Sequence, residues 1–224
     1  MTDRRRDYNK AREGTLVLVT GGASSGKSAF AESLAADMAE KEMASLNGGR
    51  LFYAATMRPD ADDAETCARI ERHRRMRRGK GFETIEMERG IAALGKMLRS
   101  GDTVILEDLP NLLANEMFPA WDDAEGSFSL PETVADLHEF LRERIIDPLF
   151  EIKKMGVNIV AVGSRVAEDL QHGYEEETLK YIEGLTYIER ETGAEADRVW
   201  EVVCGIAVAA GGGGDNAEEG TFLH

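Results

Sequence analysis

A glycine-rich segment near the N-terminus carries the residues that most clearly point to chemistry. It matches the pattern Gly-x-x-x-x-Gly-Lys-Ser/Thr and consists of Gly21, Gly22, Ala23, Ser24, Ser25, Gly26, Lys27 and Ser28. Glycines let backbone N–H groups turn inward around phosphate oxygens, while the lysine can bridge the β- and γ-phosphates and the serine hydroxyl can bind Mg²⁺. The pattern therefore predicts a bound nucleoside triphosphate, with Lys27 as a catalytic residue and Ser28 as a ligand of the metal.

Two adjacent carboxylates, Glu107 and Asp108, follow the expected strand at residues 103–106. A carboxylate at the end of a strand can complete the Mg²⁺ shell or orient a substrate hydroxyl. We expect Asp108 to join Ser28 at the metal, although the sequence does not decide between the two carboxylates. The alternative is a solvated pair at a strand end.

A strongly basic segment surrounds His73. Seven of the twelve residues from Arg69 to Lys80 are Lys or Arg, in a chain whose net charge is −15. Glu65, Arg69, His73 and Arg77 recur at i, i+4 and should share one helix face. Like charges at this density repel unless anions occupy the face, and phosphates are the expected anions. A neutral histidine can attack phosphorus, and flanking arginines would stabilise the charge that develops. A solvated charged face is the alternative.

The elements around these residues predict an α/β fold. Apolar runs of strand length alternate with helical patterns, which indicates a mostly parallel sheet with helices on both faces and a ligand site at the carboxyl ends of the strands. Together with the glycine-rich motif, this predicts a single P-loop NTPase-type domain. The expected strands are 15–20, 51–56, 82–86, 103–106, 157–162 and 198–203, and the expected helices are 27–44, 60–78, 88–99, 111–118, 132–155 and 175–193.

Length and composition set the boundaries of that domain. The 224 residues suit one core, and we expect residues 1–14 to be a basic flexible tail, 15–208 the P-loop domain, and 209–224 a disordered acidic, glycine-rich tail. We expect residues 119–131 to form an exposed loop. No stretch approaches the roughly 18 apolar residues of a membrane span. The net charge argues against binding to nucleic acid, and two cysteines without metal or disulfide spacing favour the cytoplasm.

Several segments in one order carry a family resemblance. Besides the P-loop, they are Tyr53 to Thr56 (Tyr-Ala-Ala-Thr), residues 63–73 with Arg-Ile-x-x-His, Leu106-Glu107 with Asn115, and residues 203–206 (Val-Cys-Gly-Ile). Over residues 15–208 the chain resembles the adenosylcobinamide kinase / adenosylcobinamide-phosphate guanylyltransferase family of cobalamin biosynthesis. The segment ending at His73 is the most specific part, because a generic P-loop kinase has no need of it.

The resemblance implies a bifunctional enzyme. Such an enzyme phosphorylates adenosylcobinamide with ATP or GTP, then transfers GMP from GTP through a covalent GMP-histidine intermediate, which maps onto His73. It also implies Mg²⁺, a corrinoid substrate and a homo-oligomer, with a trimer as the specific expectation. The implied nucleotide contacts outside the P-loop are Ala55, Thr56, Met57, Arg74, Arg75, Met76, Arg77, Glu86 and Glu107.

One stretch departs from the family pattern. Members commonly carry Asn-Glu-Val-Gly after the penultimate strand, where this chain has Gly163, Ser164, Arg165 and Val166. Two other hypotheses therefore stay open at the level of sequence. One is a P-loop small-molecule kinase of another specificity, in which His73 is structural. The other is a noncatalytic regulator that binds a nucleotide.

Overall fold

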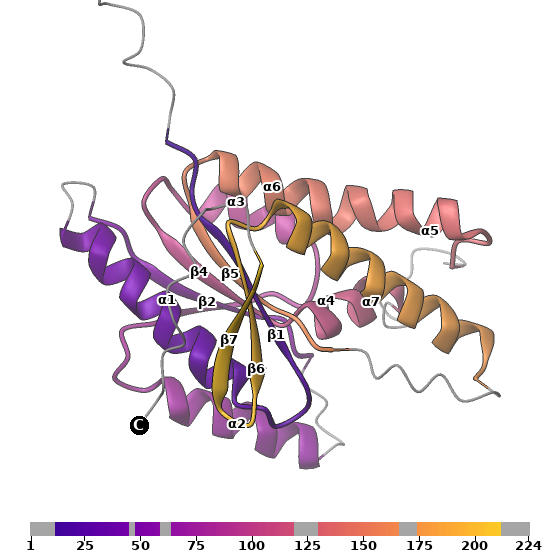
Figure 1. The fold of residues 1–224 in the computed structure, drawn as a ribbon, viewed down its shortest axis with the longest axis horizontal. Coiled ribbons are helices and arrows are strands. Elements are labelled where there is room, and N and C mark those ends of the chain that lie inside the picture. The colour runs from indigo at the N-terminus through magenta and orange to yellow at the C-terminus, as the bar shows by residue number, and fades with distance from the viewer. Residues whose placement is uncertain (1–11, 45–47, 59–63, 119–129, 166–173, 212–224) are drawn as a thin grey trace, which may run out of the picture.

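A seven-stranded sheet forms the centre of the molecule in the computed structural model, which describes residues 12–44, 48–58, 64–118, 130–165 and 174–211 (Figure 1). The strand order is β3-β2-β4-β5-β1-β6-β7. Every neighbouring pair is parallel except β6 and β7. The predicted α/β fold with a mostly parallel sheet is thus confirmed. The strands are β1 (Leu16–Gly21), β2 (Leu51–Ala55), β3 (Glu83–Glu86), β4 (Thr103–Glu107), β5 (Asn158–Val162), β6 (Arg198–Val203) and β7 (Ile206–Gly211).

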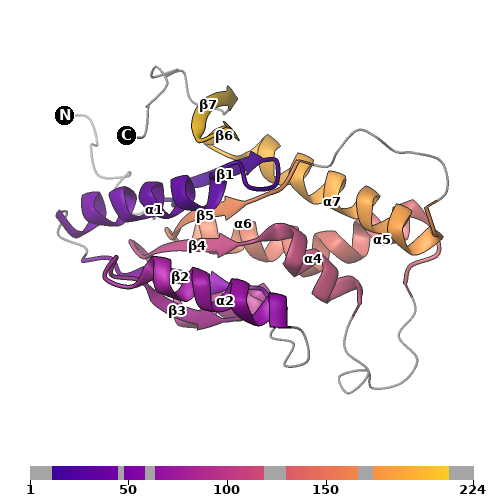
Figure 2. The ribbon, with the colours of Figure 1, turned by 90° about the horizontal axis from the view of Figure 1, so that it is seen from below.

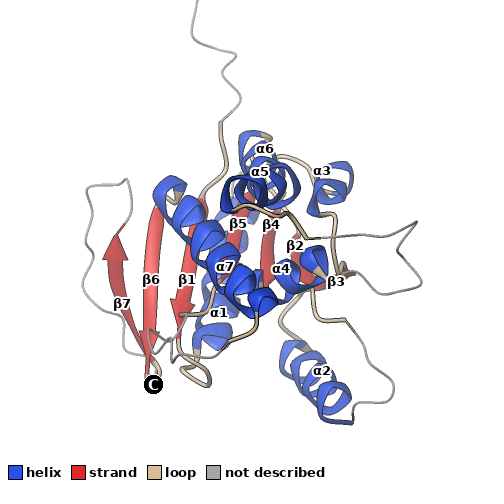
Figure 3. Ribbon diagram, turned by 90° about the vertical axis from the view of Figure 1, so that its right-hand side faces the viewer, coloured by secondary structure: helices blue, strands red, loops and turns tan. Residues whose placement is uncertain are grey.

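Helices cover both faces of this sheet (Figure 3). Helix α1 (Lys27–Ala44) packs on one face, and most of the remaining helices pack on the other. The elements of that second layer are η1 (Ile91–Ala93), α3 (Leu94–Met97), α4 (Leu109–Met117), α5 (Val134–Leu141), η3 (Arg142–Ile146), α6 (Asp147–Lys154) and α7 (Glu176–Glu195).

Alternation along β1 explains why two separate cores form. Leu16 and Leu18 belong to the core under α4 to α7, whereas Val17 and Val19 belong to the core under α1. Successive side chains of a strand point to opposite faces, so a continuous apolar run supplies both layers at once. All four residues are at most 4% exposed, so β1 lies at the centre of the domain.

Two of the expected helices differ from the structure in detail. The helix expected at 88–99 is reduced to η1 and α3. Gly90 adopts a left-handed φ of 71°, which is not helical, so the helical residues begin only at Ile91. The helix expected at 132–155 is one continuous run over 134–154 that passes through the π-helical η3. That segment ends immediately before Asp147-Pro148, and the Pro148 nitrogen has no hydrogen to donate to the helix.

The sheet also has a strand that the sequence patterns did not predict. Strand β7 forms an antiparallel hairpin with β6 around Cys204 and Gly205, which have φ values of 50° and 81°. A two-residue loop with both φ values positive matches the twist of paired strands. The strand runs to Gly211, three residues past the expected domain boundary. The remaining expected tails, and most of the loop at 119–131, lie outside the described residues.

Helix α2 (Ala64–Arg77) stands apart from the two main helical layers. It lies beside β2 and β3 in Figure 2, and it is separated from the helices of the opposite layer in Figure 3. Helix α2 is therefore a peripheral element whose position depends on a small number of contacts with the sheet and with α1.

Among the described residues, no helix is long and apolar enough to cross a lipid bilayer.

Candidate active site

The turn between β1 and α1 has the geometry of a phosphate cradle. Gly21 has no room for a side chain, because a Cβ there would lie 2.4 Å from the carbonyl oxygen of Val202. Gly26 has a left-handed φ of 93°, and its carbonyl oxygen accepts a hydrogen bond from the amide of Phe30 inside α1. The Lys27 ammonium donates to the Gly22 carbonyl oxygen at 3.1 Å. The cradle thus combines a glycine turn, a helix N-terminus and a lysine, as binding of phosphate requires.

Neighbouring segments hold the cradle from two sides. The amide of Gly205, in the β6–β7 turn, donates to the Ser25 carbonyl oxygen at 2.8 Å, and the amide of Arg165 donates to the Gly21 carbonyl oxygen at 3.2 Å. Within the described part of the chain the buried Ser25 hydroxyl has no hydrogen-bond partner. The hairpin of β6 and β7 therefore supports the phosphate-binding turn.

The two carboxylates at the end of β4 have different surroundings. Ser28 Oγ donates a 2.6 Å hydrogen bond to Glu107 Oε1, which joins the cradle directly to β4. Asp108 is the N-cap of α4, since its Oδ1 accepts from the backbone N and the side-chain Nδ2 of Asn111 at 2.9 and 2.7 Å. Glu107 thus faces the P-loop, while Asp108 stabilises the start of a helix.

Burial is the main influence on Glu107. Desolvation, followed by the negative charge of Asp108, raises the pKa of the Glu107 carboxyl to about 8, while the Ser28 hydrogen bond and the Lys27 charge oppose that rise. Glu107 Oε2 is buried and has no hydrogen-bond partner among the described residues. A buried carboxylate oxygen without a partner is costly, so this group is suited to a cationic ligand.

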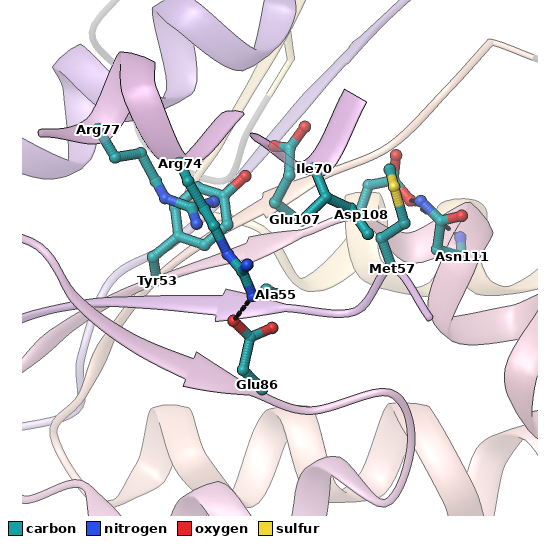
Figure 4. Close-up of a pocket in the computed structure, with 10 residues that line it drawn as sticks. All are labelled: Tyr53, Ala55, Met57, Ile70, Arg74, Arg77, Glu86, Glu107, Asp108 and Asn111. Carbon is teal, nitrogen blue, oxygen red and sulfur yellow. Dashed lines mark hydrogen bonds and ion pairs between the residues drawn. The ribbon is translucent and has the colours of Figure 1, made fainter. Parts of the chain in front are cut away.

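Beside these carboxylates lies a pocket under α2 (Figure 4). The floor comes from the ends of β2, β3 and β4, and α2 covers one side. Both apolar and charged side chains line the pocket, namely Tyr53, Ala55, Met57, Ile70, Arg74, Arg77, Glu86, Glu107, Asp108 and Asn111. Because Glu107 belongs both to the pocket and to the hydrogen bond with Ser28, the pocket adjoins the phosphate cradle.

The basic residues of α2 reach the sheet from above the pocket (Figure 4). Arg74 Nη2 lies 2.9 Å from Glu86 Oε1 at the end of β3, and the Arg77 guanidinium carbon lies 3.6 Å from the centre of the Tyr53 ring. Tyr53 is almost fully buried, and this desolvation raises the pKa of its hydroxyl against the opposing charge of Arg77. The two arginines therefore attach α2 to β2 and β3 through an ion pair and a cation–π contact.

Residues expected at the site are distributed over these parts. Ala55, Met57, Arg74, Arg77, Glu86, Glu107 and Asp108 line the pocket, and the P-loop residues form the adjoining cradle. Arg75 is exposed and does not line the pocket. Residues 73 and 76 lie in α2, but their side chains are outside the described part of the structure. Position 73 lies in the same helix, three residues after Ile70 and four before Arg77.

Thr56 has a structural part in the site. It is fully buried, and its hydroxyl lies 2.8 and 3.0 Å from the carbonyl oxygens of Glu107 and Asp108 and 2.7 Å from the Asp108 amide nitrogen. Asn115 Nδ2 donates to the Thr56 carbonyl oxygen at 2.7 Å and to that of Glu88 at 3.0 Å. Thr56 thus joins the ends of β2 and β4, and Asn115 joins the segments that follow β2 and β3.

Three pocket residues were not among the expected site residues. Tyr53 and Ile70 occur in the segments that carry the family resemblance, and Asn111 stands three residues after Asp108, the spacing of a side-chain cap. These were signals of packing and capping rather than of chemistry. Among the described residues no three His, Cys, Asp or Glu side chains gather as a metal-binding group.

The fold and the site together define a nucleotide-binding enzyme of the P-loop NTPase type. The chain matches the family of cobinamide kinase / cobinamide phosphate guanyltransferase over residues 17–210. It belongs to that family of transferases in cobalamin biosynthesis, and the match spans β1 to β7. No curated protein matches the chain. The family membership confirms the resemblance and argues against a noncatalytic regulator.

Proposed function

We propose that the chain phosphorylates adenosylcobinamide and then transfers GMP from GTP to the phosphate through a covalent intermediate on His73. The observation that carries this proposal is the position of Glu107, which lines the pocket under the histidine-bearing helix and also accepts the hydrogen bond of the P-loop Ser28. A nucleotide held by the P-loop would therefore lie between the cradle and α2. That arrangement serves phosphoryl transfer at the cradle and guanylyl transfer at the helix.

In the kinase step, the hydroxyl oxygen of the corrinoid's aminopropanol arm attacks the γ-phosphorus of ATP or GTP. The bond between the γ-phosphorus and the bridging oxygen breaks, the nucleoside diphosphate leaves and the hydroxyl proton is released. The inward-facing amides of residues 21–28 would orient the phosphates, and Lys27 would stabilise the charge on the β- and γ-phosphate oxygens.

The donors around Ser28 fit a magnesium ion. A hydroxyl, a carboxylate and phosphate oxygens are the hard ligands that Mg²⁺ prefers, and Glu107 Oε2 is a buried oxygen without a hydrogen-bond partner among the described residues. We favour Glu107 over Asp108 beside Ser28, because Asp108 accepts the hydrogen bonds that start α4. When bound, Mg²⁺ would neutralise negative charge on the phosphates.

In the guanylyl step, a ring nitrogen of His73 attacks the α-phosphorus of GTP. Pyrophosphate leaves as the bond from the α-phosphorus to its bridging oxygen breaks, and GMP remains on the histidine. A phosphate oxygen of adenosylcobinamide phosphate then attacks the same phosphorus, the P–N bond breaks and adenosylcobinamide-GDP forms. Arg74 and Arg77 line the pocket and would stabilise charge on the phosphate oxygens.

Labelling tests the covalent step directly. The protein is incubated with α-labelled GTP and Mg²⁺, and we expect an acid-labile, alkali-stable label that is lost in His73→Ala. In a second assay, adenosylcobinamide-dependent ADP formation should be lost in Lys27→Ala and retained in His73→Ala. Absence of label from the wild-type protein would refute the covalent intermediate, and ADP formation that persists in Lys27→Ala would refute the kinase role of the P-loop.

A further inference from the structure

An ion pair with a buried carboxylate connects the end of α2 to the P-loop helix. Lys80 Nζ, three residues beyond α2, lies 2.5 Å from Glu32 Oε2 in α1. The Glu32 side chain is only 2% exposed, whereas that of Lys80 is 39% exposed. A carboxylate removed from water requires a partner, so Lys80 is held at this point by the cost of leaving Glu32 unpaired.

The position of Glu32 gives this contact more than a local meaning. Glu32 follows Ser28 by four residues and so lies one turn further along the same face of α1. Burial is the main cause of the raised pKa values of the Glu107 and Tyr53 side chains, and the negative charge of Glu32 adds to both. Lys80 therefore attaches α2 to the helix that begins at the phosphate cradle.

Two further contacts of α2 among the described residues lead to the sheet. Arg74 pairs with Glu86 in β3, and Arg77 covers the ring of Tyr53 in β2. These two contacts are spaced by three residues along α2, and Lys80 follows Arg77 by three more. The end of α2 is thus fastened in turn to β3, β2 and α1. Arg74 and Arg77 also line the pocket, while Lys80 does not.

We infer that Lys80 and Glu32 are positioning residues that set the distance between α2 and the P-loop, and that they act on the guanylyl step and not on the kinase step. This inference rests on the proposed role of His73. An attacking nitrogen on α2 must approach the α-phosphorus of a nucleotide held at the start of α1, and a misplacement of about 1 Å can cost about 100-fold in rate. Phosphoryl transfer at the cradle needs no group from α2 and should tolerate such a displacement.

The test compares Lys80→Met with Lys80→Arg and with Arg78→Met. Arg78 is exposed and lies two residues from Lys80, so Arg78→Met removes the same charge without breaking the pair with Glu32. For each variant, the rate of GMP labelling from α-labelled GTP and the rate of adenosylcobinamide-dependent ADP formation are measured. We expect Lys80→Met to lower labelling by about 10- to 100-fold and ADP formation by less than about 3-fold. Lys80→Arg should regain most of the labelling, and Arg78→Met should behave as wild type.

The double variant Glu32→Gln/Lys80→Met separates positioning from a buried charge. It leaves no unpaired carboxylate, so it should unfold at a temperature close to that of wild type and still label slowly. Equal loss of both activities in Lys80→Met, unchanged labelling in that variant, or recovery of labelling in the double variant would each overturn the inference. A wild-type protein that takes no label would overturn it together with the role of His73, and the wild-type control distinguishes that case.

Discussion

The hydroxyl of Ser28 and the carboxylate of Glu107 are joined by a 2.6 Å hydrogen bond that connects the phosphate cradle after β1 with the end of β4. The two residues are 79 positions apart in the chain, and the parallel sheet brings them together. The two adjacent carboxylates therefore have different roles: Glu107 binds the phosphate cradle, whereas Asp108 caps the N-terminus of α4.

Substitution of each carboxylate should separate those roles. We expect Glu107→Gln to lower the kinase rate by about 100-fold, with no loss of folding stability, because burial makes the charged form of this carboxyl unfavourable. Steady-state ADP formation over a range of Mg²⁺ concentrations measures the first effect. Asp108→Asn should keep the cap and Asp108→Ala should lose about 1 kcal/mol, since asparagine caps helices as well as aspartate does. An Asp108→Asn variant as inactive as Glu107→Gln would reverse the assignment.

The glycines at the start of the cradle should differ in their tolerance of a methyl group. Gly21→Ala would place a Cβ 2.4 Å from the Val202 carbonyl oxygen, whereas a Cβ at Gly22 meets no atom within 4 Å. We expect Gly21→Ala to lower the free energy of unfolding by about 2 kcal/mol or more, because the backbone of β6 cannot yield as a side chain can. Urea denaturation measures this, with Gly22→Ala as the matched control. Equal destabilisation by the two substitutions would contradict the packing described here.

The stability of the protein should depend on pH through Glu189. Desolvation raises the pKa of this carboxyl to about 7 from its ordinary 4.5, against a 2.5 Å hydrogen bond from the Ser164 amide and the charge of Lys27. The folded state therefore binds more protons than the unfolded state between those values, and this residue's contribution to stability falls as pH rises from about 4.5 to about 7.

Glu189→Gln keeps an acceptor oxygen for Ser164 and removes that titration. We expect its free energy of unfolding to match the wild-type value near pH 4.5 and to exceed it at pH 8 by up to about 2 kcal/mol. Denaturation at the two pH values measures the difference, and Glu177→Gln on the exposed start of the same helix is the control. A difference that does not change with pH would show that burial of Glu189 has no such effect.

Asn115 should be required for stability beneath the pocket. Its amide nitrogen donates to the carbonyl oxygens of Thr56 and Glu88, and Asn115→Ala leaves both without this donor. Loss of a partner for a buried polar group costs about 1–3 kcal/mol, so thermal unfolding should occur several degrees lower. Asn115→Asp should be at least as harmful, because a carboxylate has no hydrogen to donate. A change below about 0.5 kcal/mol in both variants would contradict the structural role.

Much of the fold could be predicted from local patterns. The apolar runs at β1, β4 and β5 and the glycine turn before α1 are signals contained within a few residues, and they led to the parallel sheet, the phosphate cradle and the family. The basic character of α2 was equally visible, because seven Lys or Arg residues lie between Arg69 and Lys80 in a chain of net charge −15. Local patterns missed the β7 strand and overestimated the helix at 88–99, where the conformation of Gly90 decided the outcome.

The sequence by itself determined the residue types from which we propose that the site is built: a P-loop, a pair of carboxylates and a histidine among arginines. Only the tertiary structure decided which of them meet. The choice of Glu107 as the partner of Ser28, the contact of Arg77 with the Tyr53 ring and the pairing of Lys80 with the buried Glu32 all join segments that are distant in the chain. Such contacts depend on strand order and on the packing of helices against the sheet, and no local spacing of residues encodes either.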